Sequence, residues 1–235
     1  MSGESPLRAV RPGRRPIVAI DGPAGAGKST LASHLATRFG LLNLETGAMY
    51  RAFALKALQT GAALNDAATL SDLSGTTAIV LEPSTAGNRV FLDGVDVTGR
   101  IRQPDVTAAA SHVSVHPPVR RWMVAIQRQL GKQGGIVMEG RDIGTEVFPD
   151  AEIKIFLDAA PEVRGLRRFE QLGPAVTVAP ETVLREIRER DERDRTRAES
   201  PLKPAPDAVV IDSSSLTLDQ VLAAAEALVK DRLGS

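Results

Sequence analysis

Short apolar runs and longer amphipathic stretches alternate along most of the chain. The runs have the length of buried strands and lie at residues 17–20, 41–44, 136–138, 153–157 and 208–211. Apolar positions at helical spacing mark further stretches, at residues 30–39, 46–59, 161–172, 181–197 and 217–229. Strands that alternate with helices are typical of a parallel sheet covered by helices. The pattern therefore predicts an α/β fold built on a parallel sheet.

The middle of the chain interrupts this order with an antiparallel pattern. Asp93-Gly94 is a typical hairpin turn, and three short strand-like runs surround it, at residues 78–81, 89–92 and 95–97. Two amphipathic helices then return the chain to the core, at residues 104–112 and 119–130, and Pro117-Pro118 opens the second. We therefore expect one α/β domain that carries a small antiparallel insert.

A glycine-rich loop joins the first strand to the first helix and matches the pattern G-x-x-x-x-G-K-[ST]. In this setting successive backbone N–H groups point inward and the helix N-terminus adds partial positive charge, which makes a cradle for phosphates. Lys28 would reach the β- and γ-phosphates of a nucleotide, and the Ser29 hydroxyl would bind Mg²⁺. A turn that only links strand to helix needs neither Lys-Ser nor three glycines. We therefore predict a nucleotide-phosphate site formed by Gly22, Pro23, Ala24, Gly25, Ala26, Gly27, Lys28, Ser29 and Thr30.

Composition narrows the range of functions. The 235 residues suffice for one sizeable domain, and Lys plus Arg equal Asp plus Glu at 29 each, so the overall charge favours neither nucleic acid nor a membrane as partner. The absence of cysteine excludes disulfides, thiol catalysis and cysteine-based metal sites, and is compatible with a reducing cytoplasm. Residues 1–15 have the composition of a disordered tail, and no apolar run is long enough to span a bilayer. We expect a cytoplasmic monomer.

Charged residues at the ends of the strand at 136–138 and of the helical stretch at 181–197 are further candidates for metal and ligand binding. Glu139 closes an apolar strand, where an acidic residue either holds Mg²⁺ or simply caps the segment that follows. Arg190, Asp194 and Arg197 follow one another at spacings of four and three, which places them on one face of a helix. Such a face either binds phosphate and ribose together or forms a surface stripe of ion pairs. The residues alone leave both questions open.

Four motifs in this order resemble those of the bacterial cytidylate (CMP/dCMP) kinases. They are GPAGAGKS at 22–29, ETGAMYR at 45–51, GRDIGT at 140–145 and RDERDR at 190–195. The first is shared by a vast superfamily, whereas the other three in this order are characteristic of that family. The resemblance runs from about Pro16 to the C-terminus.

The fold that this resemblance implies is that of a P-loop nucleoside-monophosphate kinase, with a five-stranded parallel sheet flanked by helices. It implies a single kinase domain at residues 16–235, with its core at 16–72 and 104–235. An antiparallel insert at about 73–103 would bind the monophosphate, and a short lid at about 168–181 would cover the site. The segment 173–180 has no basic residue, so Arg164, Arg167 or Arg168 would supply the phosphate contacts of the lid.

Roles for individual residues also follow from the resemblance. The glycine-rich loop would bind ATP, and Ser29 and Glu139 would hold Mg²⁺, although Glu45 and Glu139 stand where the family usually has aspartate. Phosphoryl transfer would depend on Lys28, Arg51, Arg141 and Arg197. Thr46 and Asp194 would hold the ribose with Arg190 nearby, and Ser111, Arg120 and Asp142 would read the cytosine edge. The complete CMP site would comprise Thr46, Tyr50, Arg51, Ser111, Arg120, Arg141, Asp142, Arg190, Asp194 and Arg197.

The implied reaction is the ATP-dependent phosphorylation of CMP and dCMP to CDP and dCDP in pyrimidine nucleotide metabolism, with Mg²⁺ as cofactor. A carboxylate beside an arginine suits cytosine, whose exocyclic amine is a donor next to ring and carbonyl acceptors. Uracil would instead direct a carbonyl at Asp142, and two acceptors would face each other in a desolvated site.

Two other functions remain as alternatives at this point. A kinase of another nucleoside monophosphate, such as UMP or AMP, would keep Lys28 and the arginines but make Ser111, Arg120 and Asp142 incidental. A nucleotide-sensing switch without an acceptor would leave the arginine-rich helix face without a purpose.

Overall fold

A five-stranded parallel sheet forms the centre of the protein. The computed structural model describes residues 15–84, 87–172 and 178–234. The strand order is β2-β6-β1-β7-β8, and all neighbouring strands run parallel. The strands are β1 (Ile17–Asp21), β2 (Leu42–Glu45), β6 (Ile136–Gly140), β7 (Ile153–Asp158) and β8 (Val209–Asp212). This arrangement confirms the predicted α/β fold.

The position of each strand in the sheet explains how apolar its sequence is. Every residue of β1 and β6 is buried, because helices cover both faces of the sheet at its centre. The edge strands β2 and β8 each bury only one of their four residues. Successive side chains of β1 enter opposite layers: Ile17 and Ala19 join one apolar cluster, whereas Val18 and Ile20 join the other.

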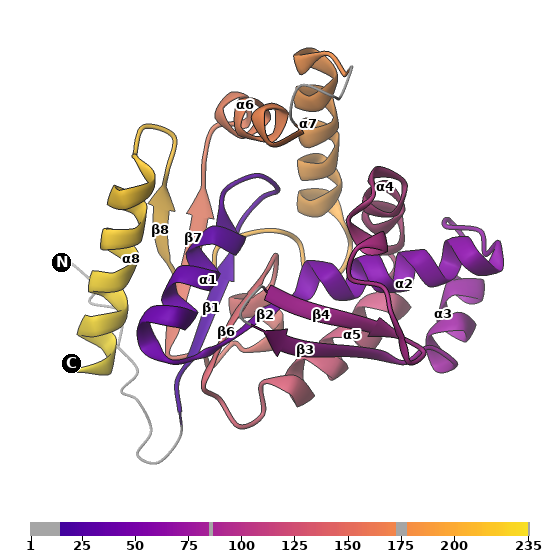
Figure 1. Ribbon diagram of the computed structural model, residues 1–235, viewed down its shortest axis with the longest axis horizontal. Coiled ribbons are helices and arrows are strands. Elements are labelled where there is room, and N and C mark those ends of the chain that lie inside the picture. The colour runs from indigo at the N-terminus through magenta and orange to yellow at the C-terminus, as the bar shows by residue number, and fades with distance from the viewer. Residues whose placement is uncertain (1–14, 85–86, 173–177, 235) are drawn as a thin grey trace.

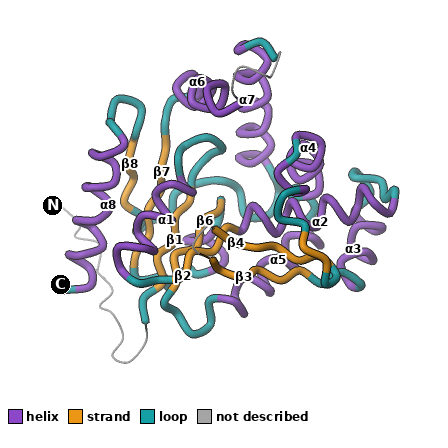
Figure 2. The backbone as a smooth tube through the Cα atoms, viewed as in Figure 1, coloured by secondary structure: helices purple, strands orange, loops and turns teal. Residues whose placement is uncertain are grey.

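Helices form a layer on each face of this sheet (Figures 1 and 2). One layer consists of α1 (Lys28–Phe39) and α8 (Leu218–Leu233), and Thr217 and Gln220 form a capping box at the start of α8. The other layer contains α2 (Thr46–Thr60), α3 (Ala67–Gly75), α4 (Pro104–Val113) and α5 (Pro117–Leu130). The sequence pattern did not predict α3, a short helix whose N-terminus is capped by the Asp66 carboxylate.

A second, antiparallel sheet lies beside the edge strand β2. It contains β3 (Ile79–Ser84), β4 (Gly87–Leu92) and β5 (Val95–Asp96), and a short 3₁₀ turn, η1 (Arg100–Arg102), leads on to α4. Asp93 and Gly94 both have positive φ, at 50° and 83°, which confirms the predicted hairpin turn. The Asn88 side chain donates to the Asn43 carbonyl at 2.7 Å and accepts from the Glu45 N–H at 2.8 Å. These two bonds anchor the small sheet to the main sheet near its ligand-facing edge.

Two helices rise together above the carboxyl edge of the sheet: α6 (Pro161–Leu172) and α7 (Pro180–Thr196) (Figure 1). The predicted lid at 168–181 falls between them, and its residues 173–177 lie outside the described part of the chain, as do residues 1–14 of the predicted tail. Helix α7 ends at Thr196, so Arg197 follows the helix with extended backbone instead of lying within it as predicted. Among the described residues, no helix is both long enough and apolar enough to cross a membrane.

Gly22 offers a test of how closely the loop after β1 packs on β7. Its φ is +149°, and a Cβ at this position would lie 2.0 Å from the Leu157 carbonyl oxygen, which is backbone and has little freedom to move. We expect Gly22→Ala to lower the free energy of unfolding by at least about 2 kcal/mol. Gly61→Ala is the control, since Gly61 has φ +68° but no neighbouring atom within 4 Å. It should cost only about 1 kcal/mol. Urea unfolding measures both, and equal losses would contradict the proposed steric cause.

Candidate active site

The glycine-rich loop joins β1 to α1 in the conformation that phosphate binding requires. Gly25 and Gly27 have φ of 77° and 97°, which L-residues with a side chain rarely adopt. Gly27 is the N-cap of α1, no side chain caps the helix, and its first turn holds no acidic residue. The first N–H groups of α1 are therefore available to an anion. Lys28 is buried, and its Nζ donates to the Pro23 carbonyl at 2.7 Å within the loop.

Lys28 shares its buried environment with charges of both signs. Burial and the neighbouring Arg141 together hold the pKa of Lys28 well below its usual value, although Glu139 acts in the opposite direction. Burial, reinforced by Glu45 across the strand pair, raises the pKa of Glu139. A polyphosphate close to Lys28 would favour its charged form.

Glu139 and Ser29 form the group predicted to hold Mg²⁺. Ser29 lies close enough to Glu139 to lower its pKa, and the buried Oε1 atom of Glu139 has no hydrogen-bond partner among the described residues. A free carboxylate oxygen beside a hydroxyl suits Mg²⁺, which prefers hard oxygen ligands and fills its other positions with water and phosphate. In the described part of the chain, no cluster of three or more His, Cys, Asp or Glu side chains is arranged to hold a metal. The residues present therefore fit a metal that arrives with its nucleotide.

A continuous chain of ion pairs runs from β6 to α5 through the end of α7. Arg141 Nε donates to Asp194 at 2.9 Å, and Arg197 lies 3.6 Å from the other oxygen of Asp194. Arg197 also lies 4.0 Å from Asp142, which accepts a hydrogen bond from Arg120 at 2.5 Å. Because Asp194 and Arg197 are buried, the predicted helix face is not a solvated surface stripe. Burial alone would raise the pKa of Asp194, but the neighbouring Arg141 and Arg190 hold this pKa below its ordinary value.

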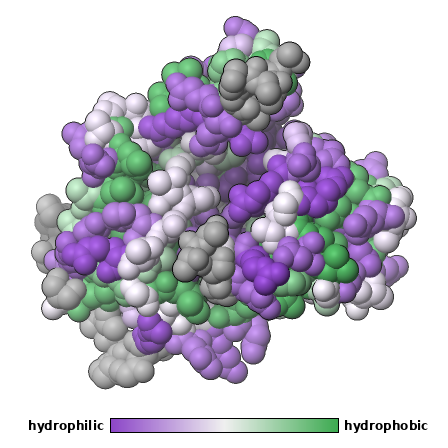
Figure 3. All heavy atoms as spheres, in the orientation of Figure 1, coloured by the Kyte–Doolittle hydropathy of each residue, from purple (hydrophilic) through white to green (hydrophobic). Residues whose placement is uncertain are grey.

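The same region contains more positive charge than its carboxylates neutralise. Burial, together with Arg141, lowers the pKa of Arg190 to about 10. Buried guanidinium nitrogens without a partner among the described residues occur on four arginines: Arg51, Arg120, Arg190 and Arg197. Unpaired buried donors are costly, and an anionic ligand would satisfy them. In the space-filling view, a strongly hydrophilic hollow opens beneath the α6 and α7 lobe (Figure 3).

The residues predicted to read the base and the ribose lie around this ion-pair chain. Arg120 is 2% exposed, and its guanidinium lies 5.7 Å from the centre of the Tyr50 ring. Burial raises the pKa of Tyr50 to about 12, so its unpartnered hydroxyl stays a neutral donor. Thr46 donates to the Glu139 carbonyl at 2.7 Å, which leaves its oxygen able to accept from a ligand. Ser111, on α4, accepts a hydrogen bond from Arg193 at 3.2 Å.

The three arginines considered for the lid have different surroundings. Arg164 is 1% exposed and donates to the Ala24 carbonyl of the glycine-rich loop at 3.0 Å. Arg167 donates to the carbonyl and the hydroxyl of Ser213, at 2.8 Å and 3.1 Å. Arg168 is exposed. Sequence reasoning gave Arg164 only a possible lid role and did not find its contact with the loop, because no local pattern marks it.

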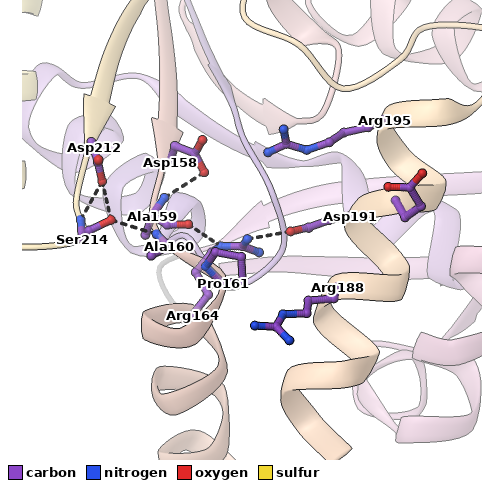
Figure 4. A pocket seen from close by; sticks show the side chains of 11 residues that line it. Asp158, Ala159, Ala160, Pro161, Arg164, Arg188, Asp191, Arg195, Asp212 and Ser214 are labelled. Carbon is purple, nitrogen blue, oxygen red and sulfur yellow. Dashed lines mark hydrogen bonds and ion pairs between the residues drawn. The ribbon is translucent and has the colours of Figure 1, made fainter. Parts of the chain in front are cut away.

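A pocket of about 530 Å³ lies beyond the loops that follow β7 and β8, against α6 and α7 (Figure 4). Its walls carry charges of both signs, with carboxylates at the strand ends and arginines on the helices. The lining residues are Asp158, Ala159, Ala160, Pro161, Arg164, Arg188, Asp191, Glu192, Arg195, Asp212 and Ser214.

Asp21 is a buried acid that sequence reasoning did not single out, although it directly precedes the glycine-rich loop. Its two carboxylate oxygens accept from the N–H groups of Ile143 and Gly144, at 2.8 Å and 2.7 Å. These residues begin η2 (Ile143–Val147), a π-helical turn that follows Asp142. Asp21 thereby fixes the segment that carries Arg141 and Asp142 relative to the phosphate loop.

The parallel sheet, the phosphate loop between β1 and α1 and the facing arginine cluster together define a P-loop kinase. A family model described as cytidylate kinase matches residues 18–231. The chain is 53% identical over 209 residues to a cytidylate kinase of Pelotomaculum thermopropionicum, an alignment that covers 88% of this chain and 92% of that one. It is 49% identical over 222 residues to a cytidylate kinase of Geobacillus thermodenitrificans, with 94% and 99% covered. A cytidylate kinase of Solibacter usitatus is 48% identical over 223 residues, with 94% of each chain covered.

The chain therefore belongs to the cytidylate kinase family and is a phosphotransferase. Family membership confirms the resemblance that the four motifs indicated.

The buried carboxyl of Asp21 should make stability depend on pH. Burial raises its pKa from 3.8 to about 6, although the two backbone N–H groups oppose this shift. Between these values the unfolded chain has released a proton that the folded protein still holds, so stability falls as pH rises. Relative to Asp21→Asn, which does not titrate, the wild type should lose about 2.4 kcal/mol of unfolding free energy between pH 4 and pH 7. Denaturant unfolding across this range measures the difference, and a level or rising difference would contradict the raised pKa.

Proposed function

We propose that this protein transfers the γ-phosphoryl group of ATP to CMP or dCMP, with ADP and CDP or dCDP as products. The observation that carries the proposal is the buried arginine cluster beside the phosphate loop, whose unpaired nitrogens require an anion. Membership of the cytidylate kinase family supports the same reaction.

The donor half of the site would be the loop from Gly22 to Thr30. The free N–H groups at the start of α1 would bind phosphate oxygens, and Lys28 would turn from the Pro23 carbonyl to the β- and γ-phosphates. Ser29 and Glu139 would hold Mg²⁺, which would neutralise part of the charge of the phosphates.

The acceptor phosphate would bind among Arg51, Arg141, Arg190 and Arg197. Arg190 and Arg141 lie close enough to Lys28 to affect its pKa, so a phosphate bound to them would face the donor loop. The ribose hydroxyls would donate hydrogen bonds to the Asp194 carboxylate and to the Thr46 hydroxyl oxygen. Asp194 already orders Arg141 and Arg197 through its two oxygens, which holds both guanidinium groups in position before the nucleotides arrive.

Arg120 and Asp142 would select the base. Each keeps hydrogen-bonding capacity beyond the bond that joins them. Nε of Arg120 has no hydrogen-bond partner among the described residues, and the Oδ1 atom of Asp142 makes a long ion pair with Arg197, at 4.0 Å. The Arg120 guanidinium would donate to the ring and carbonyl acceptors of cytosine, and the Asp142 carboxylate would accept from its exocyclic amine. Uracil would direct its carbonyl at Asp142, which disfavours UMP by leaving acceptors unpaired in a buried site.

The transfer itself needs cations more than it needs a base. The attacking phosphate oxygen is already largely ionised at neutral pH, so no side chain has to remove a proton. Lys28, Arg51, Arg141 and Arg197 would instead neutralise the charge that spreads over the transferred group and its acceptor. Closure of the region between α6 and α7 would exclude water as a competing acceptor.

The setting that we propose is pyrimidine nucleotide metabolism in the cytoplasm. The absence of cysteine is compatible with a reducing compartment. Nucleotides would be the partners of this site, and the equal numbers of basic and acidic residues in the whole chain, 29 of each, do not favour a nucleic acid as partner.

A panel of acceptors tests the proposed reaction. ADP release from Mg-ATP should be fastest with CMP and dCMP and at least about tenfold slower, in kcat/KM, with UMP, AMP and GMP. Lys28→Met should lower kcat by roughly 10³-fold with every acceptor, because it removes a cation from the transferred phosphate. A coupled assay measures both. Equal or better turnover of UMP or AMP would overturn the assignment of the base, and slow hydrolysis that CMP does not accelerate would indicate a nucleotide switch.

A double variant tests base selection separately from phosphate binding. Removal of either partner alone would leave a buried charge unpaired at a cost of about 3 to 5 kcal/mol, so Arg120→Ala is combined with Asp142→Ala. We expect kcat/KM for CMP to fall roughly 10²-fold or more while that for UMP changes far less, so that the preference disappears. Calorimetry should show unchanged ATP affinity. Retention of the full CMP preference would contradict the proposed roles of both residues.

A further inference from the structure

Arg164 is a buried charge that the proposed reaction does not use. It lies in the second turn of α6 and bonds to three segments that are far apart in the sequence. Nε donates to the Ala159 carbonyl at 2.7 Å, and a terminal nitrogen donates to Ala24 at 3.0 Å. The other terminal nitrogen donates to Asp191 on α7 at 2.6 Å, as Figure 4 shows. One planar guanidinium thus joins the loop after β7, the phosphate loop and α7.

The partner on α7, Asp191, is a sequence neighbour of the residues of that helix that are assigned to the acceptor. Asp191 directly follows Arg190 and precedes Asp194 by three residues, so all three lie within about one helical turn. Asp191 is 7% exposed, and its Oδ1 atom has no partner among the described residues. Arg164 is therefore the one side chain in the described structure to which the Asp191 carboxylate is hydrogen-bonded.

An ion pair buried to this degree contributes little net free energy to the stability of the fold. Desolvation of both charges offsets most of their attraction, and apolar packing would serve stability as well. The same two helices also carry an exposed pair, Arg188 with Glu162 at 2.5 Å, whose side chains are 58% and 59% exposed. The exposed pair could hold α6 to α7, but only the buried pair also reaches the phosphate loop.

We propose that Arg164 is a positioning residue that couples the ATP loop to the acceptor residues of α7 through Asp191. A nucleotide that orders the loop at Ala24 would then order Arg190 and Asp194 as well, so that each nucleotide binds more tightly when the other is present. This inference rests on the proposed function, because it assigns α7 to the acceptor.

The coupling follows from the geometry of one rigid group. The three acceptors of Arg164 lie in the fork of a planar guanidinium, so a shift of the loop carbonyl cannot occur without a shift of Asp191 or the loss of a bond. Displacements of about 1 Å in a phosphoryl-transfer site cost about 10²-fold in rate. A lysine at 164 would keep the charge but could not reach all three acceptors in the same arrangement.

The test compares Asp191→Asn and Arg164→Lys with Glu162→Gln, which alters only the exposed pair between the same helices. Isothermal titration measures the affinity for CMP with and without AMP-PNP and Mg²⁺. We expect the wild type to bind CMP at least about fivefold more tightly with the analogue present. In Asp191→Asn and Arg164→Lys this ratio should fall to near 1, whereas Glu162→Gln should keep it.

Kinetics provide a second readout that a purely structural role would not produce. At saturating nucleotides kcat should fall roughly 10- to 100-fold in both buried-pair variants, while KM for ATP and for CMP each rise by no more than about the coupling factor that is lost. Thermal unfolding in parallel reports the folded fraction. Loss of activity in proportion to unfolding, with an unchanged affinity ratio, would overturn the proposal.

Failure of the proposed function can be told apart from failure of the coupling. If the wild type turns over another acceptor of the panel instead of CMP, the same titrations are made with that acceptor, and the base assignment alone has failed. The proposed role of Arg164 would be overturned by either of two results. The wild type could show no coupling between ATP-analogue and acceptor binding, or the Asp191→Asn and Arg164→Lys variants could keep that coupling.

Discussion

The burial of many guanidinium groups at one edge of a parallel sheet is the constraint on which this structure depends. Arg120, Arg141, Arg190 and Arg197 all lie where the strands end, and like charges at this density repel one another in a medium that screens poorly. Asp142 and Asp194 neutralise part of the charge and hold the arginines in a chain of ion pairs. The remaining unpaired donors make the site a receptor for anions, because a bound phosphate satisfies groups that the protein leaves without partners.

The parallel sheet makes this concentration of charge possible. Its central strands are completely buried, which supplies a rigid floor, and the loops at their carboxyl ends present backbone N–H groups and charged side chains on the same side. The phosphate loop follows β1 and the Arg141–Asp142 segment follows β6, the neighbouring strand. The Asp21 carboxylate, directly before the phosphate loop, accepts from backbone N–H groups directly after the Arg141–Asp142 segment. The donor and acceptor halves of the site are therefore held together through the backbone. On the other side of the loop, Arg164 makes the equivalent connection to α7.

Much of this arrangement could be predicted from local pattern. The loop from Gly22 to Ser29 and the Asp93-Gly94 turn each depend on residues a few positions apart, and the structure confirms the turn. The helix α3 was missed because its short sequence carries a weak apolar period and its cap, Asp66, resembles an ordinary loop residue. The helical spacing predicts that Arg197 lies on α7, but the helix ends one residue earlier. Arg197 still contacts Asp194, because the chain turns back toward the site after the helix.

The sequence by itself determined the fold class, the phosphate loop and the residue types that surround the acceptor, because strand and helix periodicity and motif spacing are local properties. Only the tertiary structure decided which charges pair and which stay unpaired. Arg190, Asp191 and Asp194 are neighbours on one helix, yet Asp191 faces Arg164 and the phosphate loop while Asp194 faces Arg141 and Arg197. Spacing along a helix predicts which of its side chains share a face. The ion-pair partner of each side chain belongs to another helix or strand, however, so pairing and burial depend on how these elements pack.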